Sequence, residues 1–259
     1  MKSLLLSLSI LPVALTLSPL VWANDDGTTV SLGIGLSVAQ SPYAGANASI
    51  VPLPLLNYES ERLFFHGLSG GAHLLEGPGV GLDFILAGRM EGIDRNDFGR
   101  RELAKNGVDR DLLDDRDDGL DAGFRATWKG AAGKLQAVAK GDISDASNGY
   151  EVSFRFSHPL KFGSTEVEPG LALSYQSKQL VDYYFATSSA EVARGVPRYR
   201  PGSALVPSLG IGASRPLGGH WFLDGELTYQ FLPDRIGDSP LVDADAGSLR
   251  VKVGLSWQF

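Results

Sequence analysis

LRVKVGLSWQF, residues 249–259, ends the chain and decides the fold. Its odd-numbered positions are apolar and its even-numbered positions are small or polar. Because side chains on a β-strand alternate between two faces, this segment predicts a strand with one apolar face and one face that carries Arg250 and Lys252. The strand ends on an aromatic residue, as in the C-terminal sorting signal of bacterial outer-membrane barrels. The residues of this predicted barrel-sorting signal are Val251, Val253, Leu255, Trp257 and Phe259.

The same period of two recurs along the chain, for example from Val30 to Val38. The opposite faces of these segments carry charged side chains, which suits a polar barrel interior while lipid covers the apolar face. We therefore predict an all-β fold, a closed antiparallel transmembrane β-barrel. The alternative is a soluble sandwich, in which the apolar faces of two sheets would have to cover each other.

Eleven segments have the character of strands, whereas bacterial single-chain barrels have even strand counts. We predict twelve strands, with ten as the alternative. The region that decides between them is residues 52–89, where the alternation is weakest. The predicted strands lie near residues 29–39, 50–58, 62–73, 80–89, 119–128, 134–143, 149–158, 165–176, 203–214, 220–231 and 247–259.

The composition excludes several classes of function. The 259 residues include 32 Gly, which disfavours a helix-rich domain because an interior Gly costs a helix about 1 kcal/mol. The absence of Cys excludes disulfides, thiolate metal sites and a Cys nucleophile. The formal net charge of −7 argues against nucleic acid as a partner, because binding to phosphates needs a basic face.

The start of the chain has the pattern of an export signal. An apolar run over residues 4–20 follows Lys2 and leads to a cleavage site after Ala23. We predict a signal peptide over residues 1–23, used by the Sec route, and an outer-membrane β-barrel domain over residues 24–259. The alternative of an uncleaved membrane anchor is disfavoured because two prolines interrupt the apolar run.

The predicted inward faces hold charges of both signs. A hairpin centred near Asp238, and a short turn over residues 158–164, would bring opposite charges to cross-strand positions. Such pairs contribute up to about 1 kcal/mol each and would partly fill the barrel interior. The predicted lumen charge pairs are Asp224 with Lys252, Glu226 with Arg250, and Arg155 with Glu166.

The lengths of the connections assign the two ends of the barrel. Outer-membrane barrels have long outer loops and short periplasmic turns. The long segments are residues 90–118, 177–202 and 232–246, and the short turns are residues 130–133, 158–164 and 215–219. Candidate periplasmic contacts are Lys129, Lys134, His158, Lys161, Arg215 and His220. A candidate loop cluster, folded over the outer mouth, consists of Tyr183, Tyr184, Phe185, Pro197 and Tyr199.

No pattern in the chain predicts an enzyme. The acidic segment near Asp114 lacks the ligand spacing of a calcium-binding EF-hand, so a solvated loop is expected. The four histidines lack a nucleophile and an acid beside them. His66 and His73 fall on one predicted strand, seven residues apart, and should therefore face opposite sides. We predict no catalytic residue, no metal and no cofactor.

Five segments of the sequence form a recognisable series: SPYAG at 41–45, PLPLLNYE at 52–59 followed by Arg62, Phe64 and Phe65, VDYYF at 181–185, EVARGVPRY at 191–199 and DSPLV at 238–242. In this order and spacing they resemble the MltA-interacting protein or OmpV family of Gram-negative outer-membrane proteins. The resemblance runs from near Tyr43 to Phe259, and the family usually has Gly-Val where this chain has Ala186 and Thr187.

The resemblance implies an integral protein of the outer membrane that is not an enzyme. Its name-giving member looks like a scaffold that docks peptidoglycan-remodelling enzymes, namely a lytic transglycosylase and a bifunctional penicillin-binding protein. Lipid and lipopolysaccharide would surround such a barrel. Two alternatives stay open: a small-solute channel, because the interior is polar, and an outer-loop adhesin or sensor for cationic compounds, because other relatives are linked to those roles.

Overall fold

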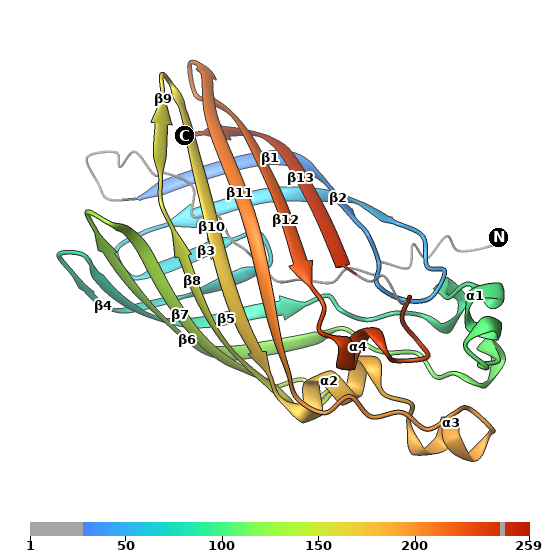
Figure 1. Ribbon diagram of the computed structural model, residues 1–259. Coiled ribbons are helices and arrows are strands. Elements are labelled where there is room, and N and C mark those ends of the chain that lie inside the picture. The colour runs from blue at the N-terminus through green and yellow to red at the C-terminus, as the bar shows by residue number, and fades with distance from the viewer. Residues whose placement is uncertain (1–27, 244–246) are drawn as a thin grey trace, which may run out of the picture.

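The computed structural model describes residues 28–243 and 247–259, which form one antiparallel sheet closed into a barrel (Figure 1). The predicted signal peptide lies outside the described residues. The strands are β1 (Thr29–Ala39), β2 (Ser49–Glu59), β3 (Leu63–His66), β4 (Ser69–Gly77), β5 (Val80–Arg89), β6 (Gly119–Gly130), β7 (Gly133–Asp142), β8 (Tyr150–Ser157), β9 (Leu160–Phe162), β10 (Thr165–Gln176), β11 (Ala204–Gly218), β12 (Trp221–Phe231) and β13 (Gly247–Gln258).

Pairing between the first and last strands closes the barrel. β1 pairs with β13 from Ser31 opposite Gln258 to Ala39 opposite Arg250. β8 and β9 both pair with β10, so they are two parts of one crossing that is interrupted at Pro159, which has no N–H to donate. The barrel therefore has twelve crossings, and the prediction of twelve strands is confirmed.

The twelfth strand comes from the region where the alternation was weakest. The predicted strand over residues 62–73 is wrong, because the structure divides it into β3 and β4. The division falls at Gly67, whose φ of +59° lies in the left-handed region that favours glycine. This turn reverses the chain and pairs Phe64 with Gly71.

The two faces of the barrel wall differ as the sequence predicts. Leu32, Ile34 and Leu36 on β1 point outward and are exposed, and Ser31 and Ser37 on the same strand are buried inside. The same division holds along the other long strands, where exposed Leu, Phe and Tyr alternate with buried Ser, Thr, Glu and Arg. An outer surface of this kind is stable only when a nonpolar medium covers it.

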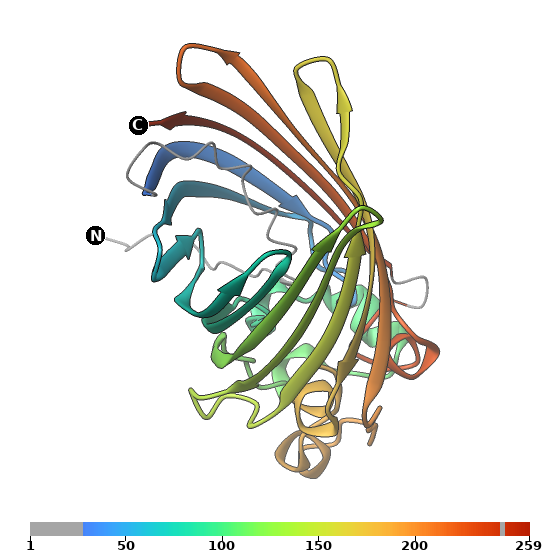
Figure 2. The ribbon, with the colours of Figure 1, turned by 90° about the vertical axis from the view of Figure 1, so that its left-hand side faces the viewer.

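The connections differ strongly between the two ends of the barrel. At one end, which we call the short-turn end, the connections between strands contain only a few residues, as at Gly163–Ser164. At the other, the long-loop end, the chain forms short helices (Figure 1). These are η1 (Arg95–Asp97), α1 (Arg100–Lys105), η2 (Arg110–Leu112), α2 (Lys178–Phe185), α3 (Ser189–Ala193) and α4 (Asp234–Gly237). In Figure 2 the ring of strands lies in front of these helices. None of the helices in the described ranges has the length and hydrophobicity to cross a membrane.

Candidate functional site

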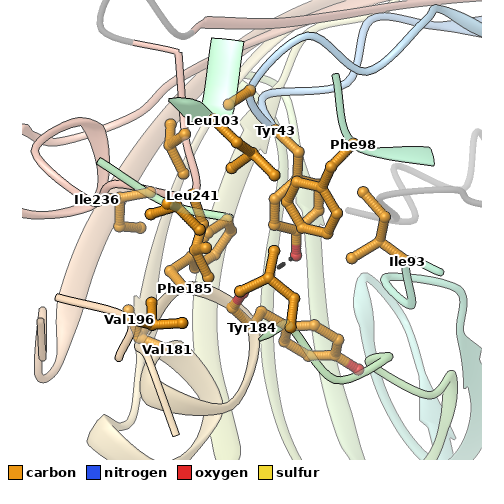
Figure 3. Close-up of a cluster of buried hydrophobic side chains, with 14 of the residues drawn as sticks. Tyr43, Ile93, Phe98, Leu103, Val181, Tyr184, Phe185, Val196, Ile236 and Leu241 are labelled. Atoms are coloured by element: carbon orange, nitrogen blue, oxygen red, sulfur yellow. Dashed lines mark hydrogen bonds between the residues drawn. The ribbon is translucent and has the colours of Figure 1, made fainter. Parts of the chain in front are cut away.

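The connections at the long-loop end share one hydrophobic core, and we call this folded unit the cap. Segments far apart in the sequence meet here, because Tyr43 packs against Phe98 and Phe185 with ring centroids 5.2 and 5.6 Å apart (Figure 3). Burial raises the pKa of the Tyr43 hydroxyl, which donates a hydrogen bond to the carbonyl of Tyr184. The buried core residues are Tyr43, Ala44, Ile93, Phe98, Leu103, Val108, Leu113, Leu180, Val181, Tyr184, Phe185, Val196, Ala204, Val206, Ile236, Leu241 and Val242.

A fully buried carboxylate joins two loops of the cap. Glu191 accepts hydrogen bonds from the backbone N–H of Ser188 at 2.6 Å and of Asp114 at 2.9 Å. It also forms an ion pair at 3.0 Å with Arg116, whose side chain is only 7% exposed. The sequence analysis missed this site, although Ser188 and Glu191 have the spacing of a helix capping box, which the structure forms at the start of α3.

The structure brings together only part of the candidate loop cluster. Tyr184 and Phe185 are in the cap core, and Tyr183 packs against it. Pro197 and Tyr199 are outside that core and are held by Thr187, whose hydroxyl donates to the Pro197 carbonyl at 3.0 Å and accepts from the Tyr199 N–H at 2.8 Å. Thr187 thus positions the second half of this loop.

A network of buried charges lies inside the barrel near the long-loop end. Arg89 is 1% exposed and bonds to Asp121, to Glu151 at 3.2 Å and to Glu91 at 3.3 Å. Lys140 adds a second cation, 3.0 Å from Asp121. The alternation along β5 to β8 predicts that the charged side chains of Arg89, Asp121, Lys140 and Glu151 point inward. It does not predict that these side chains form one network.

The predicted pairing between β12 and β13 is wrong by two residues. Lys252 lies opposite Glu226 and bonds to it at 3.1 Å, whereas Asp224 lies opposite Gly254. Arg250 lies opposite Thr228 on β12. The connection includes the helix α4, so a tight turn does not set the register there.

The predicted pair of Arg155 and Glu166 is also wrong. Arg155 lies opposite Ala172, and Glu166 lies opposite Lys161. The reversal occurs at Gly163, whose φ of +61° suits a tight turn, because the chain continues as β9 beyond the point where the turn was expected.

His66 and His73 both face the interior, on adjacent strands, so the prediction of opposite faces is wrong. Both contact Glu59, His66 at 2.8 Å and His73 at 3.1 Å. The other ring nitrogen of His73 lies 2.7 Å from Asp83, which also accepts a hydrogen bond from Arg125 at 2.8 Å. Within the described ranges, the structure contains no group of three or more His, Asp or Glu residues that could hold a metal ion.

A cavity of about 910 Å³ occupies the short-turn half of the barrel. Its walls include the histidine network, Lys129 at the end of β6 and Pro159 between β8 and β9. Among the candidate periplasmic contacts, Lys134 points into this cavity and pairs with Glu168 at 2.8 Å. The nitrogen Nδ1 of His158 lies 3.0 Å from the carbonyl of Ala132. The exposed members of that candidate set are Lys129, Lys161, Arg215 and His220.

The predicted sorting residues lie on the outward face of β13. Val253 and Phe259 are 51% and 59% exposed, and the ring of Trp257 packs against those of His220 and Trp221, each with centroids 5.1 Å away. The backbone N–H of Phe259 donates to the carbonyl of Val30, which joins the last residue to the first strand at 2.9 Å.

An antiparallel ring with apolar side chains outside and charged side chains inside defines the class of integral outer-membrane β-barrels. The family model described as MltA-interacting protein MipA matches residues 32–259, so the chain belongs to this family. The MltA-interacting protein of Escherichia coli strain K12 is 29% identical over 230 residues, which cover 88% of this chain and 90% of that protein. The outer membrane protein YiaT of the same strain is 28% identical over 241 residues, or 92% and 94% of the two chains.

Solved structures with a similar fold are more distant in sequence. An outer membrane channel from Pseudomonas putida F1 is 11% identical with a TM-score of 0.46, and the match covers 92% of this chain and 97% of that one. The NanC porin is 7% identical with a TM-score of 0.42, covering 89% and 98%. With the barrel in the outer membrane, the short-turn end is the periplasmic end and the cap lies outside.

Proposed function

We propose that this barrel is not an enzyme but a scaffold that docks peptidoglycan-remodelling enzymes at the periplasmic face of the outer membrane. The observation that carries the proposal is the asymmetry of the two ends: a folded core covers the outer mouth, whereas the periplasmic end has an open cavity and exposed cationic side chains at the ends of its strands. The name of the relative from Escherichia coli, MltA-interacting protein, supports a lytic transglycosylase as the first partner. A penicillin-binding protein would be the second.

The exposed residues Lys129, Lys161 and Arg215, which lie at the periplasmic ends of β6, β9 and β11, are the contacts we propose for that partner. Lys134 is left out of this surface because it is bonded to Glu168 inside the barrel. Cationic groups at the rim of an interface guide an acidic partner surface and set the orientation in which it docks.

Reversing these three charges should weaken capture of the transglycosylase. We expect the variant with Lys129→Glu, Lys161→Glu and Arg215→Glu to retain roughly tenfold less enzyme than the parent, because the reversed charges at the rim would repel an acidic partner surface instead of attracting it. The measurement is a pull-down of purified lytic transglycosylase on the folded barrel in detergent.

The matched control reverses three exposed charges of the cap, Arg95, Arg101 and Lys105. This control should capture as much enzyme as the parent. Equal capture by the turn variant and the parent would rule out the contact surface, and no capture by the parent would rule out this partner.

We also propose that the outward residues of β13 direct assembly into the membrane. Deleting Phe259 removes an exposed aromatic side chain and the backbone bond to Val30, so we expect severalfold less folded barrel in the outer-membrane fraction. Folded and unfolded forms are separated by electrophoresis with and without heating. Gln258→Ala, which keeps the aromatic terminus, is the control, and normal assembly without Phe259 would refute the proposal.

A further inference from the structure

The inward-facing Arg155 on β8 lacks the carboxylate partner that the sequence predicts for it. Its neighbours in the register are Gln136 on β7 and Ala172 on β10, whereas Glu166 lies near the start of β10. The Nε–H group of Arg155 is buried, and it has no hydrogen-bond partner among the residues that the structure describes. A charge inside a protein without a counter-charge is costly, so a binding partner for this guanidinium would be stabilising.

The carboxylates that act on the charge of Arg155 are bonded to other cations. These carboxylates are Glu168 and Glu226, and neither forms an ion pair with Arg155. Glu168 pairs with Lys134 at 2.8 Å. Glu226 pairs with Lys252 at 3.1 Å. The guanidinium therefore remains available to an anion that enters the barrel.

Arg155 lines a cavity of about 100 Å³ inside the barrel. Lys140 and Glu151, which belong to the buried charge network, form one side of this cavity. Arg125 and Gln136 line both this cavity and the larger cavity of about 910 Å³ at the periplasmic end. A single water needs only about 10–15 Å³, so the smaller cavity has room for a polyatomic ion. An ion from the periplasm would reach it past Arg125 and Gln136.

The charge that is left unpaired in the wall of the smaller cavity is positive. Arg125 and Lys140 are each paired with an aspartate, at 2.8 and 3.0 Å. The carboxylate of Glu151 is bonded to Arg89 at 3.2 Å. Arg155 is then the lining residue whose charge is not balanced by a bonded partner, and it would attract an anion.

The groups beside Arg155 are those that bind oxyanions. Ser153 precedes Arg155 by two residues on the same face of β8, and Ser208 lies opposite Ala172 on β11. Both serines line the smaller cavity. A guanidinium presents parallel N–H donors that match two oxygens of one oxyanion, and a serine hydroxyl can donate to a further oxygen. A halide ion cannot use this planar pair of donors in the same way.

We propose that the cavity at Arg155 binds one small oxyanion of the size of phosphate, which enters from the periplasmic end of the barrel. The bound ion would supply the counter-charge that the chain does not provide and would accept hydrogen bonds from the guanidinium. It would rest against the charge network without passing through it. This site is independent of the docking surface proposed above, because it lies inside the barrel and needs no partner protein.

Phosphorus NMR of inorganic phosphate measures this binding on the folded, full-length barrel in a detergent that contains no phosphate. We expect the parent to broaden the phosphate signal in a saturable way, and Arg155→Gln to reduce this broadening severalfold. Arg155→Lys keeps the charge but loses the planar pair of donors, so its effect should be intermediate. The matched control is Arg62→Gln, which removes an exposed cation from the connection between β2 and β3 and should bind phosphate like the parent.

Competition identifies the class of ion. Sulfate should displace phosphate from the parent, and chloride at the same concentration should not. Equal broadening by Arg155→Gln and the parent, or no saturable broadening by the parent, would overturn the proposal, and displacement by chloride as effective as by sulfate would overturn the assignment to oxyanions. Heat-dependent migration reports folding of each variant. If Arg155→Gln does not fold, binding by Arg155→Lys that equals the parent's overturns the proposal.

Discussion

Replacing Glu191 with Ala should unfold the cap while the barrel stays intact. The carboxylate is fully buried, it accepts bonds from two backbone N–H groups, and it neutralises Arg116. Removing one partner of a buried ion pair leaves the other charge uncompensated, which costs about 3 to 5 kcal/mol. The barrel does not depend on this ion pair, because the backbone hydrogen bonds between neighbouring strands close it.

Limited trypsin digestion of the folded protein in vesicles measures this effect. The variant should be cut in residues 90–118 and 177–203 much faster than the parent, while heat-dependent migration still reports a folded barrel. Glu191→Gln retains one acceptor oxygen and should have a smaller effect. Arg194→Ala removes the ion pair between Arg194 and Asp114, whose side chains are 39% and 47% exposed. Because this pair is exposed, its loss should change the digestion little. A cap that resists digestion without Glu191 would contradict this account of its stability.

The barrel was predictable because strand alternation is a local property of the sequence. The run from Val30 to Val38 and the terminal run ending at Phe259 each identify a strand and its lipid-facing side without knowledge of the partner strand. The even-number rule for bacterial barrels then required a twelfth strand. It did not locate that strand, because β3 has too few residues for a clear period and is separated from β4 only by the turn at Gly67.

Register and the cap were not predictable in the same way. The pairing of Glu226 with Lys252 depends on the path of a connection that includes α4, and no local pattern specifies that path. The cap helices have only three to eight residues, too few to be stable alone, so contacts between distant segments hold them. The packing of Tyr43 against Phe185 joins loops more than a hundred residues apart, which a single sequence does not reveal.

The cap and the charge network also bear on the channel alternative. A solute would have to cross the hydrophobic core around Tyr43 and then the network around Arg89 to pass through the barrel. The periplasmic cavity of about 910 Å³ does not by itself provide such a path. This arrangement favours a barrel that is closed to solutes and acts through its two ends, and the Arg89 network then contributes to its stability.

Replacing Arg89 with Ala should therefore strongly destabilise the barrel itself. Arg89 is the shared partner of Asp121, Glu151 and Glu91, and without it Lys140 remains paired with only two of these buried carboxylates, Asp121 and Glu151. We expect the free energy of unfolding to fall by about 3 to 5 kcal/mol, as for other buried ion pairs that lose one partner. Urea titration in detergent, with folded protein quantified by heat-dependent migration, measures the change.

Two further variants separate the network from a general sensitivity to lost charge. Lys252→Ala removes a cation that is 30% exposed and leaves one carboxylate, Glu226, which is 12% exposed, so the cost should be smaller than that of Arg89→Ala. Arg89→Ala combined with Asp121→Asn should be less harmful than the sum of the two single changes, because one uncompensated carboxylate is then absent. Additive effects in this double variant, or an Arg89→Ala barrel as stable as the parent, would show that the network does not hold the strands together. The inward charges of β5 to β8 would then be solvated by water that enters the barrel, and the interior would be more open than these contacts indicate.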